Sequence, residues 1–189
     1  ELDRLIKKMK ETEHELAQLA QEQEKLRKKV QEANKIGDPA EREEALKKLT
    51  LQQRKLQERT DELAKQLTRL RNDGAGRALG RAGGGMEQAA DQLRQGGNAE
   101  QKQDDVLDRL DEAQREVEKA RKRAEDELTR EQLTRFADVL KRLRDRQAAL
   151  NKEGERVQQD VIKNNVWSRS MVTNLSVLAG NEKDLSGET

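Results

Sequence analysis

The feature that most constrains this chain is the alternating spacing of three and four residues between its apolar side chains. At the N-terminus this series, called a seam below, runs for five heptads from Leu2 to Ala33, and Thr12 and Gln23 are its polar members. A stripe with this period follows one side of an α-helix and is narrower than the apolar face of an ordinary globular helix. The seam therefore predicts a helix that buries a narrow strip against another helix.

Composition excludes folds built on strands. The chain has 189 residues, of which 41% are charged, 32% hydrophobic and only 1% aromatic. Strands require β-branched and aromatic runs, and only Phe136 and Trp167 offer large aromatic surfaces to a core. A disordered charged chain would not maintain a seam. We predict an all-α protein, an elongated antiparallel coiled coil or helical-hairpin bundle with a long C-terminal helix.

Charge and cysteine content limit the classes of partner and chemistry. The chain has 39 basic and 38 acidic residues, a net charge of +1, and no cysteine. The charge balance gives no strong argument for nucleic acid, and the lack of cysteine excludes disulfides and a thiol nucleophile. No signal peptide or apolar run of membrane-spanning length is present. Because the seam is already in phase at Leu2, we expect a soluble fragment of a longer protein.

The first predicted domain, residues 1–72, is an antiparallel helical hairpin with its turn at 36–39. We expect Gly37 to take the left-handed conformation after the first helix, and Asp38 to cap the second helix with Pro39 at its first position. The second seam runs from Leu46 to Leu70. Two seamed helices of similar length joined by a tight turn favour a hairpin.

The second predicted domain, residues 73–128, is a hairpin rich in glycine and alanine with its turn at 96–98. Six glycines lie between Gly74 and Gly85, yet the seam continues through them. Interior glycines weaken a helix, so this helix is either a locally weak hinge or one whose small face lets another backbone approach closely. The following seam, from Ala99 to Ala124, is rich in alanine.

The third predicted domain, residues 129–189, is one long heptad helix. The seam loses phase between Ala124 and Leu133, so either Thr129 caps a new helix or the helix continues through a stutter. From Leu133 to Leu185 the phase holds, but Gly154, Asn164 and Ser168 occupy seam positions where apolar residues are expected. We expect a bend, a break or a partner contact there.

Two sets of residues are candidate binding sites. An apolar set beside and on the last seam is predicted to contact a partner: Trp167, Met171, Leu175 and Leu178. A possible basic patch is formed by two clusters: Lys119, Arg121, Lys122 and Arg123, and Lys141, Arg142, Arg144 and Arg146. Acidic neighbours neutralise both clusters, so a solvated helix face is the favoured interpretation and phosphate binding the alternative.

No pattern indicates catalysis. His14 falls on the outward face. Because it is the only histidine and the chain has no cysteine, it has no second His or Cys with which to form a metal site. The glycines from Gly74 to Gly80 match a loose dinucleotide fingerprint, but no strand precedes them. We therefore predict that the chain is not an enzyme, with no catalytic, cofactor-binding or metal residues and no cofactor.

One stretch carries a resemblance to a known group. The spacing of Ala82, Met86, Ala89 and Leu93, the glycine turn and the glutamine-rich helix after it resemble a recurring unit of large bacterial proteins. Those proteins are uncharacterised and membrane-anchored, with long helical regions rich in Gln, Glu and Arg. The resemblance covers residues 63–185, including 142–150 and 167–169. It implies a bacterial source, a membrane-tethered scaffold and no specific chemistry.

The function we expect is structural: a coiled-coil scaffold that binds helices of its own or of a partner, as a homo-oligomer or a membrane-tethered assembly. Polar seam residues are expected to fix the register of that pairing. They are Gln23, Gln53, Thr60, Gln147 and Asn164. One alternative is a nucleic-acid-binding arm, although nucleic acid is not the expected partner. Another is an amphipathic membrane-surface protein that uses 157–185, although direct membrane contact is not expected.

Overall fold

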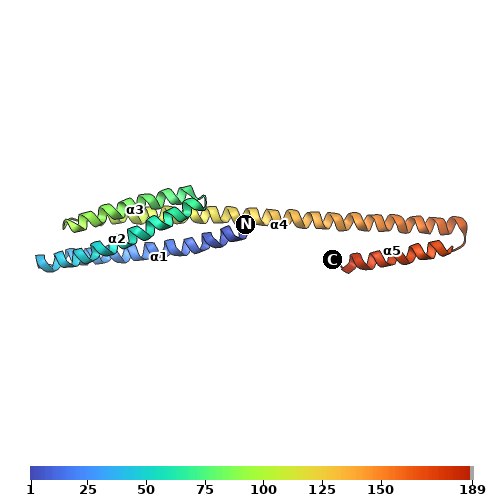
Figure 1. Cartoon of the computed structure of the whole chain (residues 1–189), viewed down its shortest axis with the longest axis horizontal. Coiled ribbons are helices and arrows are strands. Elements are labelled where there is room, and N and C mark those ends of the chain that lie inside the picture. Colours follow the sequence, from blue (N-terminus) through green and yellow to red (C-terminus); the bar gives the residue numbers. More distant parts are fainter. Residues whose placement is uncertain (188–189) are drawn as a thin grey trace. The chain divides into compact units, whose positions relative to one another are not determined.

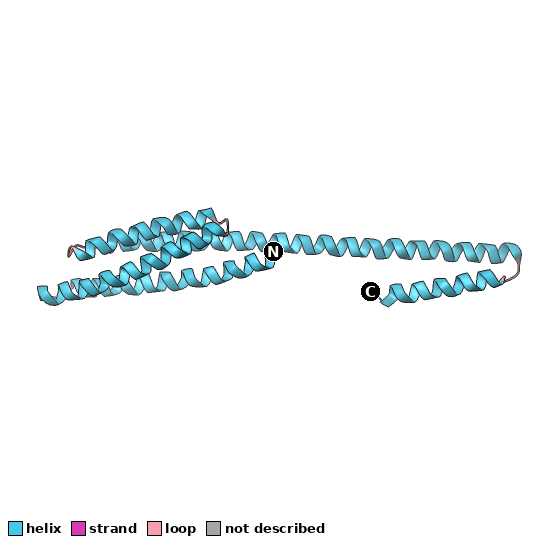
Figure 2. Ribbon diagram, in the orientation of Figure 1, coloured by secondary structure: helices cyan, strands magenta, loops and turns pink. Residues whose placement is uncertain are grey.

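The computed structural model describes residues 1–187, and this part of the chain is entirely α-helical apart from short connections (Figure 1). The helices are α1 (Leu2–Asn34), α2 (Pro39–Arg69), α3 (Asp73–Arg94), α4 (Glu100–Asn164) and α5 (Arg169–Gly187). No strand occurs among the described residues, as Figure 2 also shows. The predicted all-α class is confirmed.

The chain divides into two compact units, Glu1–Leu128 and Thr129–Thr189. The first unit contains α1, α2, α3 and the first part of α4, so it includes both of the first two predicted segments, 1–72 and 73–128. The second unit contains the rest of α4 and α5.

In the first unit, residues late in one helix meet residues early in its neighbour. Between α1 and α4, three ion pairs follow this order: Lys10 with Glu125, Glu13 with Arg121 and Arg27 with Asp104. Contacts between the other neighbours follow the same reversed order: Glu22 with Arg59, Arg54 with Asp91, Thr60 with Met86, and Arg81 with Glu112. Each helix therefore has neighbours on two sides, and the four helices surround one core.

The core of the first unit consists of the four predicted seams. Each helix contributes fully buried side chains, including Leu16, Leu67, Leu79 and Leu110. Polar seam members are buried as well: Thr12, Gln23, Gln53, Thr60 and Gln103. Burial of a leucine side chain contributes about 1.5–3 kcal/mol to folding, so the seams supply most of the stability of this unit.

Local signals set most helix ends. Asp38 caps α2 as predicted, because its Oδ1 accepts hydrogen bonds from the backbone N–H groups of Ala40 and Glu41 at 2.8 and 2.9 Å. Asn98 accepts a hydrogen bond from the N–H of Glu100 at the start of α4. The expectation for Gly37 is wrong. Helix α1 already ends at Asn34, and the one left-handed glycine among the described residues is Gly96, after α3.

The glycine-rich segment is a continuous buried helix, α3, and its small face allows close approach on two sides. A Cβ added at Gly76 would lie 3.4 Å from the backbone oxygen of Ala64 in α2. A Cβ added at Gly85 would lie 2.8 Å from Cγ2 of Val106 in α4. Of the two interpretations of these glycines, the structure favours close packing, and it places that packing against α2 as well as α4.

Helix α4 is continuous where the seam loses phase, so no new helix begins at Thr129. Helix α4 ends at Asn164 and α5 begins at Arg169, so the helix is interrupted at residues 165–168, within the predicted range 154–168. Asn165 has a φ of 51°, a left-handed conformation that asparagine tolerates better than most residues.

In the second unit, α5 packs along residues of α4 that follow position 142. Leu150 and Leu178 together line two adjacent shallow grooves between these helices. Only Val157 and Leu185 are buried among the described residues of this unit, and Leu143 and Met171 are half-buried. The second unit therefore buries much less apolar surface than the first.

Candidate helix-interaction surface

The largest exposed apolar feature of α4 lies directly after the first unit ends. It consists of Leu133, Phe136, Val139 and Leu140, which are 62, 61, 42 and 49% exposed, and is called the α4 stripe below. Leu133, Phe136 and Leu140 continue the heptad spacing, and Val139 lies next to them on the same side of the helix. Continuous apolar patches of this kind on a protein surface mark interaction sites.

The α4 stripe differs from the same helix a few turns earlier. Val106, Leu110 and Val117 also follow the heptad spacing and are completely buried in the first unit. By contrast, every residue from 129 to 142 is exposed. The seam pattern is thus the same in both places, but only the first is covered.

A second group of exposed apolar residues surrounds the connection between α4 and α5. It contains Ile162, Val166, Trp167 and Val172, and is called the turn cluster below. Trp167 is 55% exposed, and the helix preceding it ends at Asn164. The aromatic residues Phe136 and Trp167 are therefore both on the surface rather than in a core.

The four predicted partner-binding residues differ in their exposure. Trp167 and Leu175 are exposed, whereas Met171 and Leu178 are half-buried where α5 packs on α4. Leu178 lines both grooves together with Leu150, and the more exposed Leu175 lines one of them. This leaves Trp167 and Leu175 as the accessible members of the set.

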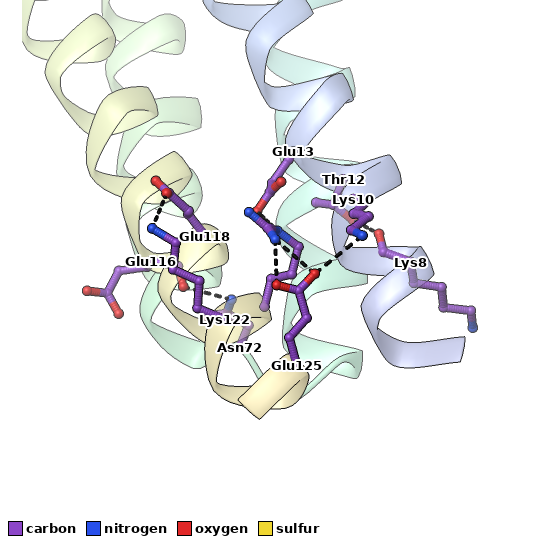
Figure 3. Close-up of polar contacts among 10 residues, drawn as sticks. Lys8, Lys10, Thr12, Glu13, Asn72, Glu116, Glu118, Lys122 and Glu125 are labelled. Atoms are coloured by element: carbon purple, nitrogen blue, oxygen red, sulfur yellow. Dashed lines mark hydrogen bonds and ion pairs between the residues drawn. The ribbon is translucent and has the colours of Figure 1, made fainter. Parts of the chain in front are cut away.

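The first predicted basic cluster is engaged by acidic side chains of the first unit. Arg121 is the clearest case: its Nε donates to Glu13 of α1 at 2.8 Å, and its Nη1 donates to Glu125 at 2.8 and 2.9 Å. Lys122 pairs with Glu118 at 2.7 Å, and Lys10 with Glu125 at 3.3 Å; Figure 3 marks both of these contacts.

The same contacts perturb the ionisation of their partners. The hydrogen bond from Arg121 lowers the pKa of Glu125, and the nearby Lys10 acts in the same direction. The hydrogen bonds that Arg121 donates to Glu13 and Glu125 raise its own pKa in turn. These are the shifts of a structural ion-pair network that ties α1 to α4.

The remaining residues of this cluster lie on the solvent side. Lys119 pairs with Glu116 at 3.7 Å, and Arg123 is exposed. Glu116 also accepts a hydrogen bond through its backbone oxygen from Nδ2 of Asn72, at 3.4 Å (Figure 3).

The second basic cluster lies on the exposed part of α4 that carries the stripe. Lys141, Arg142, Arg144 and Arg146 are all exposed. Arg144 pairs with its neighbour Asp145 at 2.7 Å, and Nε of Arg142 donates to the backbone oxygen of Asp138 at 3.3 Å. This cluster is therefore accessible and adjoins the apolar stripe, a juxtaposition that the sequence analysis did not identify.

Polar groups that could hold a metal or cofactor do not converge. His14 is exposed, and its Nε2 lies 2.9 Å from Nε2 of Gln18 on the same helix. Within residues 1–187 no three His, Cys, Asp or Glu side chains are grouped for metal binding. In the same range, none of the helices combines the length and apolar character needed to cross a bilayer.

Comparisons of this chain with protein-family models, with curated proteins and with solved structures find no significant match.

Proposed function

We propose that this protein is a structural scaffold whose function is to associate with other helices, as an antiparallel coiled-coil bundle that leaves one seam open for binding. The observation that carries the proposal is the exposure of the α4 stripe. A heptad-spaced apolar series stabilises a protein when another helix packs on it. In the first unit that partner is supplied by the chain itself, and at Leu133, Phe136 and Leu140 it is not.

The magnitude of the exposed surface supports binding. Burying one Leu or Phe side chain is favourable by about 1.5–3 kcal/mol. Three or four such residues on one stripe, together with the apolar residues that a partner helix contributes, are of the order needed to offset the cost of association. The proposed role needs no catalytic group, and the membrane-tethered bacterial setting suggested by residues 63–185 remains part of the proposal.

The test is a change of two stripe residues to polar ones, Leu133→Gln with Phe136→Gln. Association of the full chain with itself is followed by light scattering over a range of concentrations. Association with a panel of leucine-seamed helical peptides is followed by fluorescence anisotropy. We expect at least one of these associations in the parent chain and its loss in the variant.

The matched control is Leu51→Gln with Val177→Gln, because these side chains are 63 and 57% exposed but lie outside both the stripe and the turn cluster. The control should associate like the parent chain. If the parent chain stays monomeric and binds no peptide, or if the control loses binding as fully as the stripe variant, the proposal is wrong.

A second candidate function, contact with a membrane surface, is favoured by one specific observation. The turn cluster exposes Ile162, Val166, Trp167 and Val172 around a helix connection, and tryptophan is suited to the interface between water and lipid. Flotation with lipid vesicles tests it, and Trp167 is the only tryptophan, so its emission reports directly on burial in lipid. Protein that stays unbound with unchanged emission would remove this candidate.

A further inference from the structure

We infer that the α4 stripe binds an acidic amphipathic helix supplied by a different protein. This inference rests on the proposed function and adds the chemistry of the partner. It depends on three features: the spacing of the stripe, the charges beside it, and the consequences of pairing the stripe with itself.

The spacing selects a helix as the partner element. Leu133, Phe136 and Leu140 occupy alternating core positions of a heptad, and the half-buried Leu143 continues them. Side chains at this spacing interlock with those of a second helix laid along the first.

The charges beside the stripe select an acidic partner. Each heptad has two core positions and two positions that flank them. One flanking position directly follows the second core residue, and the other directly precedes the first core residue of the next heptad. Around the stripe they are occupied by Arg130, Gln132, Ala137, Val139, Arg144 and Arg146. Every charged residue among them is basic. Acidic residues on the facing helix would complement them.

The part of α4 around the stripe also carries a net positive charge. Residues 129–150 contain six basic and three acidic residues, whereas residues 100–118 of the same helix contain three basic and eight acidic ones. Within the first unit, that acidic stretch is matched by basic side chains of its neighbours, as in the pairs Arg27 with Asp104 and Arg81 with Glu112. Acidic and basic side chains thus face each other between helices of the first unit. The same complementarity at residues 129–150, which are mostly basic, requires an acidic helix.

A second copy of the chain fits less well. If two stripes paired in opposite directions and were centred on each other, the flanking positions would bring Arg130 of each copy toward Arg144 of the other. Like charges that face each other across a helix pair are destabilising, and these arginines would gain no acidic partner from the second copy.

The experiment uses the full chain and three fluorescent peptides of three heptads, each with leucine at the core positions. The flanking positions carry glutamate in one peptide, lysine in the second and glutamine in the third. We expect the glutamate peptide to bind about tenfold more tightly than the glutamine peptide at low salt, and the lysine peptide to bind most weakly. Added salt should reduce the preference, because the flanking charges are solvent-exposed.

The variant Arg130→Glu with Arg144→Glu should reverse the order of the glutamate and lysine peptides. Its control, Lys152→Glu with Lys163→Glu, changes net charge by the same amount at exposed positions away from the flanks. The control should keep the order of the parent chain. Helix content by circular dichroism verifies that both variants fold.

The outcomes separate this inference from the proposed function. Equal binding of all three peptides would overturn the acidic preference and leave helix association intact. Self-association that Phe136→Gln abolishes, without peptide binding, would make a second copy the occupant and overturn the inference alone. Absence of both kinds of association would overturn the inference and the proposed function together.

Discussion

The side-chain amides of Gln23 and Gln53 exchange two hydrogen bonds across the interface of α1 and α2, and both residues are completely buried. Nε2 of Gln53 donates to Oε1 of Gln23 at 2.8 Å, and Nε2 of Gln23 donates to Oε1 of Gln53 at 3.3 Å. Gln103 of α4 adds a third helix, because its Nε2 donates to the same Oε1 of Gln53 at 3.2 Å. The polar layer therefore aligns three helices at one level of an otherwise apolar core.

Gln53 is the centre of this layer, so its removal has the largest predicted cost. Gln53→Leu keeps the size of the side chain but leaves buried amides of Gln23 and Gln103 without a partner. We expect a loss of about 1–3 kcal/mol in the free energy of unfolding. Urea denaturation followed by circular dichroism measures it.

The triple replacement of Gln23, Gln53 and Gln103 by leucine is the informative control. It removes every partner at once, so its stability should lie near that of the parent chain or above it. A triple variant less stable than Gln53→Leu alone would show that the layer contributes through more than mutual satisfaction of its amides.

Adjacent glycines of α3 should respond oppositely to alanine. A Cβ at Gly84 meets no atom within 4 Å, so Gly84→Ala should stabilise the protein by about 0.5–1 kcal/mol through helix propensity. A Cβ at Gly85 would lie 2.8 Å from the buried Val106, so Gly85→Ala should destabilise it by about 1–3 kcal/mol. Thermal and urea unfolding of the two variants provide the comparison, and equal effects would contradict the observed packing of α3 on α4.

The ion pairs between α1 and α4 predict a pH dependence with a definite sign. Hydrogen bonding by Arg121 lowers the pKa of Glu125 in the folded protein, so this carboxylate stabilises the fold at pH values above its ordinary pKa. The contribution is lost as the pH falls through the lowered pKa. Glu125→Gln should therefore be less stable than the parent chain at neutral pH, and the difference should shrink below about pH 4.

Urea titrations at several pH values test this expectation. Glu127→Gln provides the control, because Glu127 is exposed on the same helix. A stability difference for Glu125→Gln that did not change with pH would mean that the lost contact is one of packing and not of charge.

The rate of amide hydrogen exchange should differ between two parts of α4. Amides of residues 103–124 are in a helix whose seam is covered, whereas those of 129–142 have only their own helical hydrogen bonds, so the latter should exchange much faster. Amides around Leu79 and Ala82 in α3 should be among the slowest, because these side chains are completely buried. Exchange followed by mass spectrometry in dilute solution measures both.

Slow exchange at 129–142 that persists on dilution would contradict the uncovered state of the α4 stripe. Fast exchange at Leu79 and Ala82 would instead restore the interpretation of the glycine-rich segment as a weak hinge.

Much of the first unit follows from periodicity. The seam residues Leu16, Leu67 and Leu110 are predicted as buried and are buried. Asp38 is predicted at a helix start and caps it, and Asn98, in the predicted turn at 96–98, caps the helix that follows. These features are readable because helix period and capping depend on residues within a few positions of one another.

Arg121 illustrates what the periodicity of the sequence cannot predict. Its sequence neighbours place it in a basic cluster, but Glu13, which lies 108 positions earlier, accepts a hydrogen bond from it. Likewise, Phe136 and Leu140 have the same four-residue seam spacing as Val106 and Leu110 but the opposite exposure. Spacing identifies which face of a helix is apolar, and it contains no information about what lies on that face.

The sequence by itself determined that this chain is helical, where most of its helices begin and end, and which side of each one is apolar, because these depend on local sterics, capping and period. The tertiary structure decided that the first four seams share one core, that Gln23, Gln53 and Gln103 meet at one level, and that the α4 stripe is left open. Those outcomes depend on which distant segments pack together, since the same apolar spacing is compatible with many pairings.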